Sequence, residues 1–219
     1  MGNFIRRYAL EIYTVLSMLL LVCAAMIGEL SVIRKLVVID TFLFILHQWE
    51  ETRYPGNLFD MMGTLFQVNI NDNLKQLIHI PAGISLLILS VVSFVFDKTP
   101  MITVALATFG MIEGFVHTVG IRVFRTQKFY TPGMVTAWLE MGVSVLTILY
   151  LATNHLGKWY DYLLGPAIML VGFGIFQKTM TLLLGIRYRD LPKYLISLTS
   201  RCRSGRRRRQ EHHRRGFCR

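Results

Sequence analysis

Long apolar runs separated by short polar segments make up most of this chain. A helix needs about 20 apolar residues to cross the roughly 30 Å hydrocarbon core of a bilayer. Runs of about that length lie near residues 9–28, 31–51, 75–96, 101–121, 134–153 and 162–185. The pattern therefore predicts an all-α, polytopic transmembrane bundle of about six spans.

The second run is the weakest of the six. Arg34, Lys35 and Asp40 interrupt its first half, so a half-span is the alternative. Residues 52–74 are too polar and too short to span. We expect a loop there, with an amphipathic segment near residues 57–68 lying at the membrane surface.

Composition supports a membrane protein and argues against a soluble domain. Of the 219 residues, 53% are hydrophobic and only 17% are charged, whereas a soluble domain has roughly 25% charged residues. The net charge of +11 comes mostly from residues 201–219, which hold nine arginines and one acidic residue. We therefore expect a helical bundle over residues 1–190 and a basic, disordered tail over 191–219.

Lysine and arginine positions predict the orientation, because short cytoplasmic loops carry an excess of both. With six spans the two termini share one side. That side collects seven basic residues even without the tail, and the other side collects four: Arg34, Lys35, Lys98 and Lys158. The sequence thus predicts that both termini are cytoplasmic.

Ionisable residues recur at one depth of the predicted bundle. The alternating direction of the spans brings the end of the second, the start of the third, the end of the fourth and the start of the fifth to one side. These segments carry His47, Glu50, Glu51, His79, Glu113, His117 and Glu140. His47 and Glu51 are four residues apart, as are Glu113 and His117, so each pair shares a helix face. Charges facing lipid are costly, so we expect these groups to face one another or a water-filled cavity.

Imidazole and carboxylate groups in a dry pocket favour a divalent metal site, with zinc, manganese or non-haem iron as candidates. The predicted ligands are His47, Glu51, Glu113 and His117, with His79 as a further ligand. Glu50 and Glu51 are adjacent and cannot point the same way. Spacing favours Glu51 as the ligand and leaves Glu50 as the acid/base or as a partner for a loop.

Structural explanations stand beside the metal hypothesis. A hydrogen bond or interfacial position is favoured for His79 and Glu140 taken singly. Asp40 is expected to pair with Arg34 or a neighbouring span. Gly110 and Gly114 follow the Glu113 face and predict close approach of another helix. In "YTPG", Gly133 suits a turn position that needs a positive φ.

Two motifs carry a resemblance to a known family. The segment "HQWEE" at 47–51 and the segment "EGFVHTVGIRVFRTQKFYTPGMVTA" at 113–137 resemble the signatures of the HxxEE family of multi-span membrane proteins, over residues 40–150. The resemblance implies a multi-span protein of undefined function, considered a possible membrane enzyme because of these polar motifs.

These observations predict a metal-dependent membrane enzyme that acts on a lipid or other membrane-soluble substrate. Hydrolysis is the first expectation and iron-dependent oxygen chemistry the second. A proton- or ion-coupled transporter and a non-catalytic protein using the cluster for packing are the alternatives. We expect the arginine-rich tail to bind anionic lipid head groups, and we expect no nucleic-acid partner.

Overall fold

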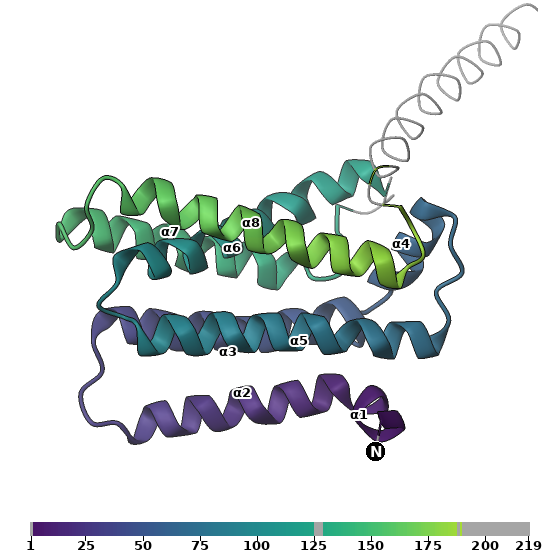
Figure 1. Cartoon of the computed structure of the whole chain (residues 1–219), viewed down its shortest axis with the longest axis horizontal. Coiled ribbons are helices and arrows are strands. Elements are labelled where there is room, and N and C mark those ends of the chain that lie inside the picture. Colours follow the sequence, from purple (N-terminus) through teal and green to yellow (C-terminus); the bar gives the residue numbers. More distant parts are fainter. Residues whose placement is uncertain (1, 125–128, 188, 190–219) are drawn as a thin grey trace, which may run out of the picture.

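The computed structural model describes residues 2–124, 129–187 and 189, and within these every regular element is an α-helix (Figure 1). Six long helices make up the body: α2 (Ala9–Met26), α3 (Val32–Thr52), α5 (Asp72–Val95), α6 (Pro100–Val123), α7 (Met134–Thr153) and α8 (Asp161–Leu183). Two short helices, α1 (Gly2–Arg7) and α4 (Leu58–Phe66), precede α2 and α5. The predicted all-α bundle is confirmed.

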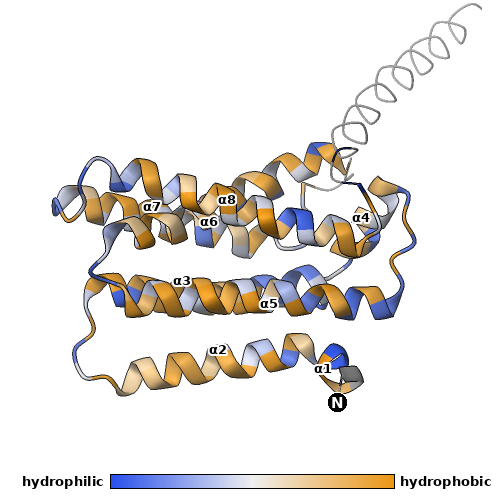
Figure 2. Cartoon of the chain, viewed as in Figure 1, coloured by the Kyte–Doolittle hydropathy of each residue, from blue (hydrophilic) through white to orange (hydrophobic). Residues whose placement is uncertain are grey.

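Five of the long helices, all except α3, are long and apolar enough to cross a membrane. Figure 2 shows the apolar colouring along these helices and the hydrophilic residues gathered at the helix ends and loops. Helix α3 carries more charge, yet it continues unbroken for 21 residues. Among the described residues, the second of the six predicted runs is thus the one that does not qualify as a candidate span.

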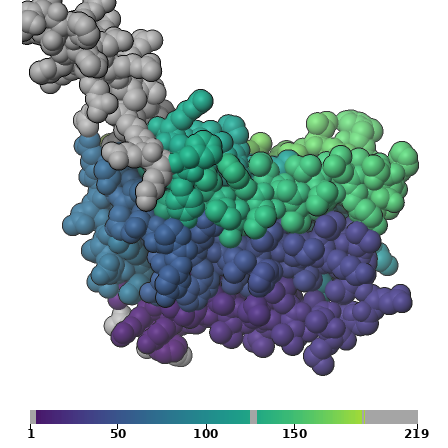
Figure 3. Space-filling view, turned by 180° about the vertical axis from the view of Figure 1, so that it is seen from behind, coloured from purple at the N-terminus to yellow at the C-terminus, as the bar shows by residue number. Residues whose placement is uncertain are grey.

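Helix α3 packs against α2, α5 and α7 on one side, and Ile39, Phe42 and Leu46 are exposed on another face. Helix α6 in turn packs against α7 and α8. The space-filling view shows the N-terminal helices, in purple and indigo, stacked below the later helices in teal and green (Figure 3). Asp40 and His47 are buried on the packed side of α3, where the neighbouring helices shield them from lipid.

Helix boundaries follow local sequence signals. The Ser31 side chain accepts a hydrogen bond from the Arg34 backbone N–H, and Asn71 accepts one from Leu74, so each caps the helix that follows. Pro100 occupies the first turn of α6, where its missing N–H is not needed. These signals place the starts of α3, α5 and α6 within a few residues of the positions that hydropathy predicts.

The amphipathic segment after the first motif forms α4, but it does not lie only at the surface. Phe59, Met62 and Phe66 pack against a buried apolar cluster. That cluster comprises Ile70, Ile78, Met180, Leu184 and Ile186. Helix α4 therefore closes one end of the bundle over α5 and α8, because its apolar face finds protein rather than lipid.

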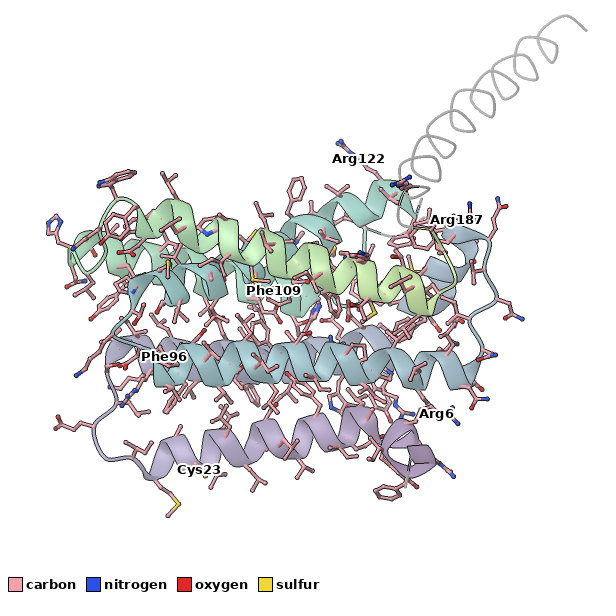
Figure 4. All side chains as sticks on the ribbon, viewed as in Figure 1. Arg6, Cys23, Phe96, Phe109, Arg122 and Arg187 are labelled. Atoms are coloured by element: carbon pink, nitrogen blue, oxygen red, sulfur yellow. The ribbon has the colours of Figure 1, made fainter. Side chains whose placement is uncertain are left out.

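One end of the bundle gathers both the N-terminus and the end of α8 (Figure 1). Arg6, Arg122 and Arg187 lie at this end, whereas Cys23 and Phe96 lie at the opposite end (Figure 4). The two ends of the described chain therefore lie at the same end of the bundle (Figure 1). The basic tail at 191–219 falls outside the described residues.

Candidate metal centre

Four side chains from two helices meet inside the end of the bundle that holds the N-terminus. Helix α3 supplies His47 and Glu51, and α6 supplies Glu113 and His117. Glu51 Oε1 lies 3.4 Å from His47 Nε2 and 3.3 Å from His117 Nε2. Glu113 Oε2 lies 3.8 Å from each of the same two nitrogens. We call these four residues the His/Glu cluster.

The His/Glu cluster is well shielded. The side chains of His47 and His117 are only 4% and 5% exposed, and those of Glu51 and Glu113 are 14% and 16% exposed. Ligand atoms of His47, Glu113 and His117 all lie within 4.8 Å of one another, a spacing that can accommodate a metal ion. The sequence prediction that these two motifs converge is therefore confirmed.

Hydrogen bonds at the Nδ1 atoms orient both imidazoles. His47 Nδ1 lies 3.1 Å from the carbonyl oxygen of Gly133, which only accepts, so Nδ1 carries the proton. The Thr131 hydroxyl donates to the His117 backbone carbonyl, which leaves its oxygen to accept from His117 Nδ1 at 3.3 Å. Both Nε2 atoms consequently face the carboxylates, and a hydrogen bond at the other ring nitrogen is the arrangement that orients histidine for a metal.

Gly133 is the residue that allows this approach. Its φ of +89° lies in the left-handed region, as the turn prediction required. A Cβ at this position would lie 2.7 Å from Glu51 Cγ, 2.7 Å from His117 Cε1 and 2.9 Å from His47 Cε1. The α7 N-terminus can therefore sit directly against the cluster only because residue 133 has no side chain.

Glu50 points away from the cluster and holds the start of α7. Its carboxylate accepts hydrogen bonds from the backbone N–H groups of Val135 at 3.2 Å and Thr136 at 2.9 Å, and from the hydroxyls of Thr136 and Tyr130. Both oxygens are thus engaged as a cap on the first turn of α7. This geometry favours the loop-binding alternative for Glu50 over the predicted acid/base role.

Tyr130 reinforces this cap from the loop before α7. Its hydroxyl donates to Glu50 Oε1 at 2.8 Å. Partial burial and the hydrogen bond to Glu50 raise the pKa of the Tyr130 hydroxyl above its ordinary value. The phenol therefore stays protonated and remains a donor at neutral pH.

His79 does not join the His/Glu cluster, although the sequence predicts it as a further ligand. Its ring makes an edge contact with Phe59, with the ring centroids 5.4 Å apart. It lines a separate cavity of about 350 Å³ together with Arg7, Arg53 and Lys75. The start of α5 faces α1 and α4 rather than α6, and this places the imidazole in a different environment.

Asp40 and Glu140 are buried more deeply in the bundle, on the same faces of α3 and α7 as the cluster contacts. The expected pair between Asp40 and Arg34 is wrong, because Arg34 binds Asp97 at 3.2 Å at the far end of α3. Asp40 is 2% exposed and Glu140 is 0% exposed, and neither carboxyl has a hydrogen-bond partner among the described residues.

Sequence reasoning missed the contributions of Thr131 and Thr136. Both hydroxyls contact a cluster imidazole, His117 and His47 respectively. The sequence offers one indication of this role, which is their position on either side of the "PG" turn. The turn itself explains threonines at these positions equally well. Their role depends on how α7 packs against α3 and α6, which the sequence does not specify.

A helical membrane bundle with a buried histidine and carboxylate centre is the class that this fold and site define. Residues 38–148 match the family model described as "Protein of unknown function with HXXEE motif", and the chain belongs to that family. No curated protein and no solved structure matches the chain. The matched region contains all four residues of the His/Glu cluster.

Proposed function

We propose that this protein is a metal-dependent membrane enzyme acting on a lipid or another membrane-soluble substrate. The observation that carries the proposal is the orientation of His47 and His117, whose Nε2 atoms face two carboxylates while their Nδ1 atoms are held by other hydrogen bonds. Two ring nitrogens and a carboxylate with an open position are ligands typical of catalytic zinc, and the same donors suit manganese or non-haem iron.

The spacing of the ligand atoms supports the proposal. Tetrahedral zinc with bonds of about 2.0–2.1 Å separates neighbouring ligand atoms by about 3.4 Å. The two contacts of Glu51 Oε1, at 3.4 and 3.3 Å, have this length. The contacts of Glu113 at 3.8 Å are slightly longer, so Glu113 is the carboxylate with more freedom to bind a water molecule instead.

The chemistry we propose is hydrolysis close to the membrane interface. A metal at this position would lower the pKa of bound water to near neutral and polarise a carbonyl or phosphoryl oxygen. The residues of the chain hold the imidazoles in one tautomer, exclude bulk water and aim two carboxylates at one point. The cluster lies at the ends of α3 and α6, so a lipid head-group linkage is within reach from the bilayer surface.

Metal content measured on purified protein tests the proposal. We expect about one equivalent of a divalent metal in the unmutated protein and its loss in His47→Ala and His117→Ala. His155→Asn is the matched control, because His155 is an exposed histidine with a φ of +52° that asparagine tolerates. A metal-free unmutated protein, even after incubation with zinc, manganese and ferrous iron, would contradict the proposal.

A second experiment distinguishes the roles of Glu51 and Glu113 in metal binding. Glu51→Gln is expected to weaken metal binding more than Glu113→Gln, because Glu51 lies closer to both imidazoles. Metal titration of both variants in detergent provides the measurement. Equal loss in the two variants would assign both carboxylates as ligands of equal weight.

A further inference from the structure

Two carboxyl groups outside the His/Glu cluster lie inside the bundle without partners. Asp40 on α3 and Glu140 on α7 are 2% and 0% exposed. All four of their oxygens are buried and lack a hydrogen-bond partner among the described residues. An ionised carboxylate without a partner costs several kcal/mol in such surroundings, so the group takes up a proton instead.

Asp40 and Glu140 lie on the same faces of α3 and α7 as the residues that form or contact the cluster. Asp40 precedes His47 by seven residues, about 10 Å along α3. Glu140 lies one turn after Thr136, whose hydroxyl is 3.0 Å from His47 Nδ1. Because α3 runs toward the cluster and α7 runs away from it, both carboxyls lie on the inner side of the cluster.

Glu140 is the nearer of the two to the cluster. It lies about 6 Å along α7 from Thr136, whereas Asp40 lies about 10 Å along α3 from His47. One turn further along α7, the Ser144 hydroxyl is fully buried and has no partner within the described part of the chain. Polar groups in this condition are the kind that buried water molecules bridge.

We propose that Asp40 and Glu140 form the inner part of a proton path that ends at the His/Glu cluster, and that both are held as neutral carboxylic acids. Thr136 joins this path to the cluster, since its hydroxyl contacts His47 and is one helical turn from Glu140. The inference stands on the packing of α3 and α7 and does not require the proposed enzyme activity.

The proton step is balanced within the chain and its bound water. The O–H bond of Glu140 breaks, and an O–H bond forms on a water or substrate oxygen at the cluster. Asp40 then gives its proton, through bridging water, to the Glu140 carboxylate, and a proton returned from the cluster by the reverse steps makes Asp40 neutral again. No electron is transferred and no redox partner is needed, and the same steps in reverse carry a proton away from the cluster.

Infrared spectroscopy of the reconstituted full chain tests the first half of the proposal. A neutral carboxylic acid has a C=O stretching band above the amide bands. We expect this band in the unmutated protein, with part of it lost in Glu140→Gln and part in Asp40→Asn. Glu29→Gln, which alters an exposed carboxyl in the loop after α2, is the control and leaves the band unchanged. Absence of the band in the unmutated protein would overturn the proposal.

Exchange of the carboxyl proton for deuterium in D₂O tests the second half of the proposal, which is the path between Glu140 and the cluster. We expect the Glu140 component to shift on transfer to D₂O, severalfold more slowly in Thr136→Val. Thr147→Val is the matched control on the same face of α7, because its buried hydroxyl bonds only its own helix, at Val143. A Glu140 band that does not exchange, or one equally fast in Thr136→Val, would reduce both carboxyls to structural groups and overturn the path.

A measurement on the unmutated protein protects the test against variants that fail to fold. A hydrophobic carbodiimide modifies neutral carboxyls buried in membranes, and peptide mass spectrometry locates the product. We expect modification at Glu140 or Asp40 and none at exposed Glu29. If neither the modification nor the infrared band were observed, the proposed proton path would be overturned. The proposed enzyme function is tested separately, by the metal content of the purified protein.

Discussion

The formation of the His/Glu cluster depends on one residue, Gly133, in the turn before α7. Gly133 has no Cβ, and this absence lets the turn before α7 press against both imidazoles and Glu51. The carbonyl of the same residue fixes the proton on His47 Nδ1. One glycine thus supplies both the space and the orientation that the centre needs.

Gly133→Ala is expected to destabilise the protein and abolish metal binding. The new Cβ requires shifts of two imidazoles and places alanine at a φ of +89°, which costs on the order of 1–3 kcal/mol. Thermal unfolding in detergent and metal titration are the measurements. Gly142→Ala, on the same helix with nothing within 4 Å of the added Cβ, should match the unmutated protein in both.

His79→Ala is expected to leave metal stoichiometry unchanged, because His79 contacts Phe59 and lines a separate cavity. The measurement is the same elemental analysis used for His47→Ala. Loss of metal in the His79 variant would show that this imidazole moves into the cluster when an ion binds. The sequence prediction of a fifth ligand would then be restored.

At the scale of the helix, the start of α7 depends on a residue from α3. Glu50 accepts the first backbone N–H groups of α7, a task that a residue of the same segment commonly performs. This cap ties the "HQWEE" motif to the "YTPGMVTA" segment, which lies 80 or more residues away. The two motifs therefore form one structural unit.

Glu50→Ala is expected to lower the free energy of unfolding by about 1–2 kcal/mol, the range for loss of a helix cap. Glu50→Gln, which keeps one acceptor oxygen, should lose less. Unfolding in detergent ranks the two variants. If Glu50→Gln matched the unmutated protein in stability but lost an enzyme activity assigned later, the acid/base role would regain support.

Close packing of α6 and α7 rests on glycines facing larger side chains. A Cβ at Gly114 would lie 2.7 Å from Met141 Cβ and 3.1 Å from the Ala137 carbonyl oxygen. The prediction of close helix approach at Gly110 and Gly114 is therefore confirmed. This contact sets the distance between Glu113 and the turn that carries Gly133.

Gly114→Ala is expected to separate α6 from α7 and to cost about 1–3 kcal/mol, as overpacking commonly does. Thermal unfolding measures this loss, and metal titration shows whether the shift reaches the cluster. Gly172→Ala on α8, where the added Cβ meets nothing within 4 Å, is the control. Equal stability of the two variants would mean that the α6 contact relaxes without strain.

At the scale of the molecule, the basic end of the bundle carries the His/Glu cluster and the N-terminus. We predict that this end faces the cytoplasm, since Lys and Arg favour that side, and that the arginine tail binds anionic lipids there. Cysteines introduced one at a time into a cysteine-free background test the orientation. Lys158→Cys should react with an impermeant maleimide on intact cells, and Arg122→Cys should react only after lysis.

The opposite labelling pattern would place the cluster on the outer side of the membrane. The tail has its own measurement, which is a comparison of full-length and 1–200 protein reconstituted in vesicles with and without anionic lipid. We expect only the full-length protein to make the surface of anionic vesicles less negative. Equal effects of the two proteins would contradict a lipid role for the tail.

The sequence by itself determined the helices and the pairing of the two motifs. Apolar runs of spanning length specify their own secondary structure, since lipid leaves the backbone no partner outside the helix. Alternation of the spans then brought His47, Glu51, Glu113 and His117 to one depth. Local periodicity carries this information, so no three-dimensional contact was needed to find it.

Only the tertiary structure decided which neighbours these residues have. It turned Glu50 to the α7 cap, placed His79 beside Phe59 and paired Arg34 with Asp97. It also left Asp40 without a hydrogen-bond partner in the described part of the chain. The physical reason is that a helix pattern fixes the depth and face of a side chain, whereas its partner depends on how neighbouring helices rotate and pack. That rotation is set by contacts such as Gly114 against Met141, which are distant along the chain.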